Sequence, residues 1–367
     1  MIDKIFPTFG VQKLQPYIPG KPIEELQREF GLSSIIKLAS NENPLGASEK
    51  VKIALTKELN SLTRYPDGNG FILKKALSEK YSVELNQITL GNGSNDVLEL
   101  IARAFLNEQT SAIFSQHAFA VYPISVQAVG AQAIVTPAKN WGHDLTAMAN
   151  AVVENTRVIF LANPNNPTGT WFTRAELTEF MHRVPKNVVV VLDEAYCEYA
   201  QPAEYPNGLD FLAEHENLII TRTFSKAYGL AALRVGYALS SPELADILNR
   251  VRQPFNVNHF ALVAASVALQ DGEYLEQSRV LNQAGMQQLE QGFSELNLSY
   301  IPSIGNFIAV DFLTPAEAIY QALLKLGVIV RPVANYQMPT FLRVSIGTQE
   351  ENQRFLAALT QVLTDRY

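Results

Sequence analysis

The chain has 367 residues, more than one hydrophobic core usually serves, so we expect two domains. Apolar residues make up 47% and charged residues 18%, and the formal net charge is −7, which argues against a general affinity for nucleic acid. The single cysteine, Cys197, excludes an intrachain disulfide. The five scattered histidines include no pair at helical metal-ligand spacing, so we expect no bound metal.

The beginning of the chain, MIDKIFPTFG, has no apolar run after a basic start and does not predict a signal peptide. The longest apolar runs elsewhere have about five residues, whereas a bilayer span needs ~20. A cytoplasmic protein is therefore expected.

Residues 1–37 contain four early prolines and little periodicity, which predicts an extended arm with a short helix at 22–30. Such an arm is poorly ordered unless it packs on something, and a partner subunit is one candidate. We expect this segment to form part of a small domain.

From residue 47 to 267, helical patterns alternate with short apolar runs. VKIALTKEL and FILKKALSEKY have helical spacing, whereas ITLGNG, AIFS, AIVTP, RVIFLAN, VVVVLDEA and LIITRTFS predict strands that are mostly apolar on both faces. Such strands alternating with helices indicate an α/β fold with a mainly parallel sheet between two layers of helices. We assign residues 38–267 to this large domain.

The pattern changes after about residue 268. LEQSRVLNQAGMQQLEQGFSEL predicts a long helix, and strand signals follow at FIAVDF, VIVRP and FLRVSI, with helices expected at 314–325 and 349–365. Residues 268–367 therefore predict a smaller α+β domain.

The segment TFSKAYGLAALRVGY (residues 223–237) follows an apolar strand and is the first candidate for chemistry. The hydroxyls of Thr223 and Ser225 and the guanidinium of Arg234 suit an anionic group, and Lys226 can form an imine with an aldehyde. A solvated loop with two surface cations is the alternative.

Asp193 follows four valines and a leucine, at the C-terminal end of a probable central strand. Ligands of open parallel sheets bind beyond such strand ends, and a buried aspartate there needs a partner, for example a pyridinium nitrogen. Tyr196 could donate to a phenolate oxygen. Alternatively, Asp193 caps the next element and Tyr196 belongs to the core.

Three further segments are weaker signals when each is taken alone. Residues 163–169, NPNNPTG, form a turn cluster at a strand end that can aim one amide at a ligand. In residues 91–96, GNGSND, a helix begins where Ser94, Asn95 and Asp96 can each act as a cap and where free N–H groups can receive phosphate. Phe119, after the strand AIFS, can stack on a flat cofactor. A plain connection, a tight turn and a core phenylalanine are the alternatives.

In order and spacing, these five segments together resemble the aspartate-aminotransferase superfamily of pyridoxal-phosphate enzymes (fold type I), over nearly the whole chain. The resemblance implies a seven-stranded sheet in the large domain. It implies that Lys226 is the Schiff-base lysine and proton shuttle, and that Asp193 pairs with the pyridine nitrogen. The other implied cofactor contacts are Tyr196 and Asn166 to the ring O3′, Phe119 stacked on the ring where many relatives carry Tyr or Trp, and a phosphate site of Ser94, Asn95, Thr223, Ser225 and Arg234.

Within this superfamily, KLASNENPLG (37–46), RYPDGNGFILKKAL (64–77), LQPYIPGKP (14–22) and VIVRPV followed by LRVSIGT are typical of the histidinol-phosphate aminotransferase branch. By this similarity, Tyr65 would reach the phosphate of the neighbouring subunit's cofactor, which implies a homodimer with shared active sites. The resemblance places four more residues on the substrate side: Tyr17, Asn41, Arg331 and Arg343.

The activity implied by the resemblance is transamination of L-histidinol phosphate with 2-oxoglutarate, giving imidazole acetol phosphate and L-glutamate in histidine biosynthesis. Two alternatives stay open. One is an aminotransferase for aromatic amino acids, and the other is a pyridoxal-phosphate lyase or decarboxylase acting on a phosphorylated amino acid. A cofactor-binding regulatory module fits poorly, because such modules usually come fused to a DNA-binding domain and the sequence has no basic helix for one.

Overall fold

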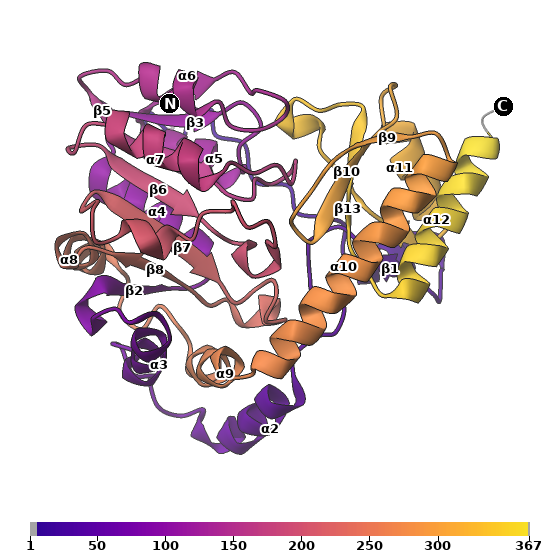
Figure 1. The fold of residues 1–367 in the computed structure, drawn as a ribbon. Helices are drawn as coiled ribbons and strands as arrows, with labels where there is room; N and C mark the ends of the chain where they lie inside the picture. Colours follow the sequence, from indigo (N-terminus) through magenta and orange to yellow (C-terminus); the bar gives the residue numbers. More distant parts are fainter. Residues whose placement is uncertain (1–5, 366–367) are drawn as a thin grey trace, which may run out of the picture.

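A seven-stranded sheet forms the centre of the larger part of the chain in the computed structural model, which describes residues 6–365. Its order is β2-β8-β7-β6-β5-β3-β4 (Figure 1), and every strand runs parallel to the others except β8, which is antiparallel to both of its neighbours. The strands are β2 (Ile88–Gly91), β3 (Ser111–Ser115), β4 (Gln132–Thr136), β5 (Thr156–Ala162), β6 (Val189–Asp193), β7 (Leu218–Thr223) and β8 (Gly236–Ser240). The predicted α/β class and seven-stranded sheet are confirmed.

Helices cover both faces of this sheet because its strands are apolar on both faces. In β6, Val189 and Val191 face one helical layer, whereas Val190 and Leu192 face the other. The first layer contains α4 (Ser94–Phe105), α5 (Val121–Ala128) and α8 (Pro242–Val251). The second contains α3 (Phe71–Tyr81), α6 (Leu145–Asn150), α7 (Arg174–Arg183) and α9 (His259–Leu269), and α2 (Glu49–Glu58) packs on α9.

The edge strand β4 departs from the expected two-sided burial. Most of its residues are exposed or half-buried, and Val135 is 49% exposed. The antiparallel strand β8 was not predicted, since GYALS directly follows the candidate segment around Lys226 and is too short to show a period of its own.

The C-terminal part has its own antiparallel sheet and its own apolar cluster. The order of this sheet is β12-β13-β10-β9, with β9 (Ser299–Ile301), β10 (Phe307–Asp311), β12 (Arg331–Pro332) and β13 (Phe341–Ser345). Its helices are α10 (Gly272–Glu295), which runs diagonally from the large sheet to this part in Figure 1, α11 (Glu317–Lys325) and α12 (Gln349–Thr364).

The N-terminal segment joins this smaller part. After α1 (Ile23–Phe30), β1 (Ile36–Lys37) pairs in parallel with β11 (Val328–Ile329). The beginning of the predicted arm, residues 1–5, lies outside the described residues. Further along, Gly10 packs tightly against the backbone at Gln127 and Gly130 of the same chain. The expected domain boundaries, at residues 37/38 and 267/268, stay a prediction.

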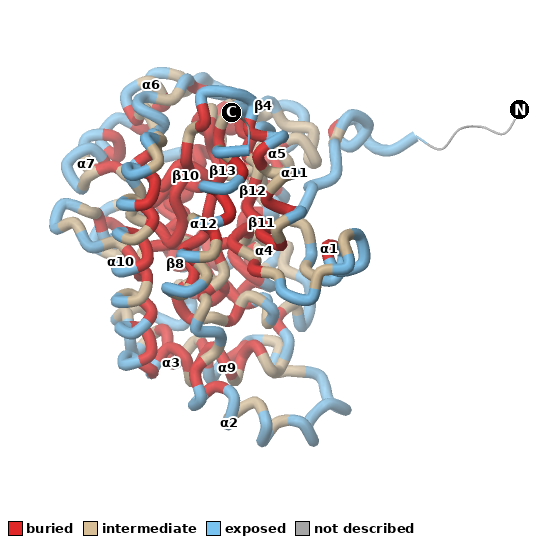
Figure 2. The backbone as a smooth tube through the Cα atoms, turned by 90° about the vertical axis from the view of Figure 1, so that its right-hand side faces the viewer, coloured by how far each residue is buried: buried red, intermediate tan, exposed pale blue. Residues whose placement is uncertain are grey.

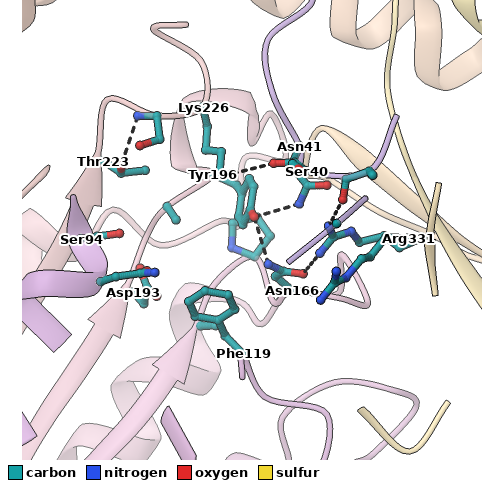
Figure 3. Close-up of a pocket in the computed structure, with 18 of the residues that line it drawn as sticks. Ser40, Asn41, Ser94, Phe119, Asn166, Asp193, Tyr196, Thr223, Lys226 and Arg331 are labelled. Atoms are coloured by element: carbon teal, nitrogen blue, oxygen red, sulfur yellow. Dashed lines mark hydrogen bonds between the residues drawn. The ribbon is translucent and has the colours of Figure 1, made fainter. Parts of the chain in front are cut away.

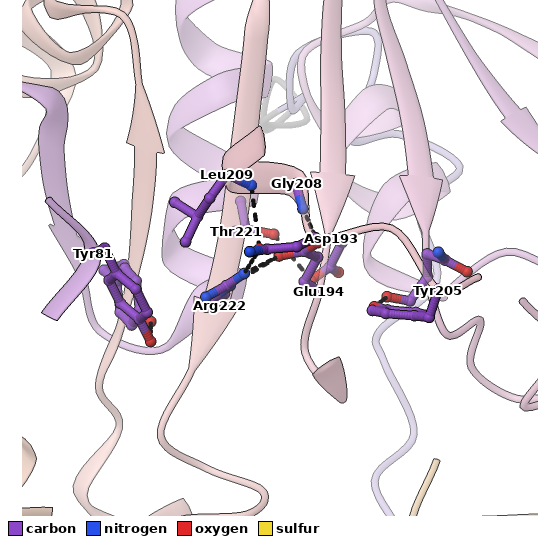
Figure 4. A network of polar contacts seen from close by, with 11 residues as sticks. Tyr81, Asp193, Glu194, Tyr205, Gly208, Leu209, Thr221 and Arg222 are labelled. Carbon is purple, nitrogen blue, oxygen red and sulfur yellow. Dashed lines mark hydrogen bonds and ion pairs between the residues drawn. The ribbon is translucent and has the colours of Figure 1, made fainter. Parts of the chain in front are cut away.

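A buried ion pair lies on one face of the large sheet (Figure 4). Arg222 of β7 donates from Nε (2.8 Å) and Nη2 (2.7 Å) to one carboxylate oxygen of Glu194, whose other oxygen accepts from the backbone N–H of Gly208 at 2.8 Å. Nη2 also donates to Asn207. The side chains of Arg222 and Glu194 are 8% and 1% exposed, so each charge depends on the other for its solvation.

We expect the substitution Glu194→Gln to lower the free energy of unfolding by about 3–5 kcal/mol, because it leaves the Arg222 guanidinium buried without a counter-charge. Asp246→Asn is the matched control, since it breaks the exposed pair with Arg250 and is expected to cost below ~1 kcal/mol. Urea unfolding followed by circular dichroism measures both. Equal effects of the two substitutions would contradict the prediction.

Candidate active site

A pocket opens beyond the C-terminal ends of β5, β6 and β7, where the large sheet meets the smaller part (Figure 3). In a parallel sheet these strand ends lie at one edge, which brings together segments far apart in sequence. All the predicted site residues except Tyr65 line this pocket: Tyr17, Asn41, Ser94, Asn95, Phe119, Asn166, Asp193, Tyr196, Thr223, Ser225, Lys226, Arg234, Arg331 and Arg343.

Lys226 follows β7 and projects into the pocket, where its Nζ donates to the carbonyl oxygen of Ser40 at 3.0 Å. Burial, and then the nearby charge of Arg343, lower the pKa of Lys226 from 10.5 to about 7. A large share of this lysine is therefore a neutral amine near neutral pH, and a neutral amine is the nucleophilic form.

Asp193 ends β6 and is 5% exposed. Its two oxygens accept hydrogen bonds from the hydroxyls of Tyr122 (2.8 Å) and Thr221 (2.9 Å). Burial raises the pKa of Asp193 to about 6 in spite of these two bonds. The carboxylate is thus fixed in position, and a cationic group beside it would favour the ionised form.

An anion cradle is formed by the start of α4 with Thr223, Ser225 and Arg234. Gly93 is the N-cap of α4 and offers no side-chain hydrogen bond, so Ser94, Asn95 and Asp96 lie inside the first turn and do not act as the cap that the sequence allowed. The N–H groups of this first turn carry the positive end of the helix dipole. A Cβ at Gly93 would come within 2.5 Å of Arg234, so glycine keeps the cradle open.

A chain of hydrogen bonds crosses the pocket from the smaller part to Tyr196. Arg343 of β13 donates to the side-chain oxygen of Asn166 and, from Nη2, to the carbonyl of Ala39 at 2.7 Å. The amide nitrogens of Asn166 (3.1 Å) and Asn41 (2.9 Å) both donate to the Tyr196 hydroxyl. The Nε of Arg343 is buried and finds no acceptor among the described residues, which leaves it available to an anionic ligand.

The remaining lining residues close the pocket. Phe119 packs edge-to-face on Tyr122, with ring centroids 5.9 Å apart. Arg331 donates to the carbonyl of Ile18 at 2.7 Å and lies over the ring of Tyr17, so the N-terminal segment covers this side. Tyr65 lies elsewhere: it is 83% exposed and stacks on Phe255.

Tyr122 and Thr221, whose hydroxyls donate to Asp193, were not predicted from the sequence. Thr221 lies two residues before Thr223 on β7, and the period of a strand puts both on the same face of the sheet. Tyr122 stands three residues after Phe119 at the start of a helix, so helical spacing gave a signal of proximity. The carbonyl of Ser40 carried no signal in the side-chain pattern.

Comparisons with known proteins agree with this geometry. The family model described as "Aminotransferase class I and II" matches residues 33–359. "Histidinol-phosphate aminotransferase 2" of Pseudomonas fluorescens (strain Pf0-1) is 66% identical over 96% of each chain, and its namesakes in Pseudomonas aeruginosa and Pasteurella multocida are 64% and 54% identical.

Solved structures of aminotransferases have the same fold as this chain. The crystal structure of histidinol-phosphate aminotransferase from Sinorhizobium meliloti in complex with pyridoxal-5′-phosphate has a TM-score of 0.91 at 29% identity and covers 98% of both chains. Aspartate aminotransferase from Thermus thermophilus, in complex with maleate, matches with a TM-score of 0.84 at 21% identity and supports the fold alone.

The lowered pKa of Lys226 makes a prediction about stability in the absence of ligands. Its folded pKa of about 7 lies below the unfolded value of 10.5, so the unfolded chain binds more protons between these values and unfolding is favoured there. This cost, up to about 4 kcal/mol at pH 7, disappears as the pH rises toward 10.5. We therefore expect Lys226→Met to be more stable than the wild type at pH 7, by an amount that shrinks at higher pH.

Urea unfolding of both proteins at several pH values between about 7 and 10 measures this difference. Lys75→Met, at an exposed position of α3, is the control and should show no such pH dependence. A stability difference for Lys226→Met that does not change with pH would refute the assigned pKa.

Proposed function

This chain belongs to the aminotransferase class I and II family, and from that premise we propose that it transfers the amino group of L-histidinol phosphate to 2-oxoglutarate with pyridoxal 5′-phosphate as cofactor. The products would be imidazole acetol phosphate and L-glutamate, in histidine biosynthesis. The observation that carries the proposal is a single pocket in which Lys226 and the buried Asp193 share space with an anion cradle and two arginines, Arg331 and Arg343. The names of relatives at 54–66% identity support the substrate.

The residues of the pocket fit this cofactor. The uncapped start of α4, which Gly93 and Gly236 keep open, suits a phosphate together with Ser225 and Arg234. A buried carboxylate with a raised pKa, Asp193, suits a protonated ring nitrogen. Phe119 would flank the ring, and Tyr196 and Asn166 would face its oxygen. When bound, the cofactor supplies an electron sink for charge that develops on the substrate carbon next to the amine.

Lys226 and Asp193 would perform the proton chemistry. With a pKa of about 7, a large share of Lys226 has a neutral Nζ at neutral pH, so this amine can accept a proton from the substrate carbon next to the amino group. A positioned base of this kind typically contributes ~10²–10⁴-fold to the rate. The charge of Asp193, held by Tyr122 and Thr221, would keep a proton on the ring nitrogen throughout.

Arg331 and Arg343 would bind the acidic groups of the two substrates. Both residues are buried, at 7% and 6% exposed. Arg331 donates to the backbone carbonyl of Ile18, and Arg343 donates to that of Ala39. A guanidinium can pair bidentately with either a phosphate or a carboxylate. One site can therefore serve a phosphorylated amine in one half of the reaction and a dicarboxylic oxo acid in the other.

A homodimer is the assembly that fits the exposed surface. The segment that follows α2, residues 59–65, is exposed and projects from the body at the bottom of Figure 2. Large apolar side chains are exposed on α2, on this segment, at the start of α3 and at residue 255, which stacks on Tyr65: Ile53, Leu59, Leu62, Tyr65, Phe71, Ile72 and Phe255. Such a surface on a monomer marks an interaction site. We propose that a second copy covers it and that Tyr65 reaches the partner's pocket.

Hybrid dimers test this arrangement. Lys226→Ala and Tyr65→Ala are each expected to lose most or all turnover as homodimers. In a hybrid of the two, one site has Lys226 from one subunit and Tyr65 from the other, so a random mixture should recover about a quarter of the wild-type rate. Mixed and separately measured variants are compared in one steady-state assay. No recovery from a proven hybrid would exclude the shared site, and substantial turnover by the Lys226→Ala homodimer would exclude the role of the lysine.

Substrate preference is tested by a half-reaction without oxo acid. We expect histidinol phosphate to shift the visible absorption of the holoenzyme to shorter wavelength at concentrations at least about tenfold lower than phenylalanine does. The reason is that buried arginines bind an anionic phosphate through strong, charge-assisted hydrogen bonds. The reverse order would assign the enzyme to aromatic amino acids. Release of CO₂ without any need for an oxo acid would assign it to the lyases.

No helix within residues 6–365 is long and apolar enough to cross a membrane. The cytoplasmic location expected from the sequence stays a prediction.

A further inference from the structure

Among the residues that the structure describes, the hydroxyl of Tyr196 has two hydrogen-bond partners, and both are amide nitrogens. Nδ2 of Asn41 lies at 2.9 Å and Nδ2 of Asn166 at 3.1 Å (Figure 3). An amide nitrogen only donates, so the Tyr196 oxygen accepts both bonds and its own hydrogen points to neither partner. The side chain is 4% exposed, which makes the direction of that hydrogen a property of the site.

The orientation of the Asn166 amide is fixed by Arg343. Nη1 of Arg343 donates to Oδ1 of Asn166, and a guanidinium has no acceptor that could pair with the amide nitrogen. Nδ2 of Asn166 must therefore face Tyr196.

The orientation of the Asn41 amide is fixed by Ser345. The Ser345 hydroxyl accepts from the backbone N–H of Asn41 at 2.8 Å and donates to Oδ1 of Asn41 at 3.1 Å. Ser345 is 3% exposed, so an inverted amide would leave its hydroxyl hydrogen buried without this acceptor. Nδ2 of Asn41 is thus held toward Tyr196 as well.

The backbone of Asn41 is held in an unusual conformation. Its φ is +54°, in the left-handed region of the backbone map, which asparagine tolerates but glycine favours. The carbonyl of Asn41 accepts from Nδ2 of Asn306 at 3.0 Å, and its N–H donates to the hydroxyl of Ser345, so Asn306, just before β10, and Ser345 of β13 together hold this conformation. Glycine would adopt it more easily, which indicates that the asparagine side chain has a task of its own.

We propose that Asn41 is a positioning residue that turns the hydroxyl hydrogen of Tyr196 into the pocket. Together with Asn166 it occupies the acceptor sites of the phenol oxygen, so the hydroxyl must act as a donor to a ligand. Two donors on one oxygen also polarise the O–H bond and strengthen its own donation. This role differs from the substrate contact expected for Asn41 from the sequence. It rests on the proposed cofactor site, where the hydrogen would meet an anionic oxygen on the ring.

The substitution Asn41→Asp tests this role at almost constant volume. It replaces a donor by an acceptor, so the Tyr196 hydrogen turns back toward residue 41. We expect pyridoxal phosphate to bind the cofactor-free protein about tenfold more weakly, the loss of roughly one hydrogen bond. The pH midpoint of the bound cofactor's visible absorbance change should rise, because the lost donor no longer stabilises an anionic oxygen. A merely structural defect would lower thermal stability without moving that midpoint.

A double-mutant cycle with Tyr196→Phe decides whether Asn41 acts through Tyr196. In the phenylalanine background, Asn41→Asp should change the cofactor dissociation constant by less than about twofold. An equal tenfold loss in both backgrounds, or no loss in the tyrosine background, would overturn the proposal. Asn41→Gly, which suits the positive φ, repeats the cycle and decides alone if the aspartate variant does not fold. Failure of the wild type to bind pyridoxal phosphate would instead refute the proposed function.

Discussion

The parallel pairing of β5, β6 and β7 is the constraint on which the site depends. The backbone N–H of Asn163 donates to the carbonyl of Asp193, and the N–H of Glu194 donates to the carbonyl of Thr221. These bonds hold the C-terminal ends of the three strands side by side at one edge of the sheet. Each strand then releases its chain into a loop at the same edge of the sheet. Segments roughly thirty residues apart consequently deliver an amide, a carboxylate and an amine to one pocket.

The two faces of β6 and β7 divide the charges at this edge. Asp193 lines the pocket and accepts from Thr221, while the next residue in each segment, Glu194 or Arg222, meets its partner on the opposite face. The second pair is fully compensated, whereas Asp193 and Lys226 keep pKa values that burial moves toward their neutral forms. Burying an ionisable group without an opposite charge lowers the stability of the protein. Such groups are retained where a bound ligand can supply the opposite charge.

The sequence predicted the sheet and most of the pocket, because both follow from local patterns. An apolar run such as VVVVLD predicts a buried strand without any knowledge of its neighbours. In the segment from Lys226 to Arg234, the candidate functional residues lie close together in the sequence. The sequence could not give relations that tertiary packing creates. The antiparallel β8, the roles of Tyr122 and Thr221 beside Asp193, and the Ser40 carbonyl that receives Lys226 depend on which elements become neighbours. The sequence also did not predict that the start of α4 lacks a side-chain cap. Ser94 and Asn95 are residue types that favour the N-cap position, but Gly93 occupies it.

The two parts of the chain contribute different side chains to the pocket. The large sheet and its loops provide Asp193, Lys226 and the anion cradle, the groups proposed to hold the cofactor. Arg331 and Arg343 come from the smaller antiparallel sheet, Tyr17 comes from the N-terminal segment, and Asn41 follows β1, the strand that joins this segment to the smaller part. A substrate that binds both arginines must therefore bridge the two parts. Because Arg343 reaches Tyr196 through Asn166, and Ser345 reaches it through Asn41, the smaller sheet also sets the direction of a donor that belongs to the cofactor side. A shift of β13 relative to β6 would move Arg343 and Ser345 together, so the substrate contact proposed for Arg343 and the hydrogen bonds that orient Tyr196 would change at the same time.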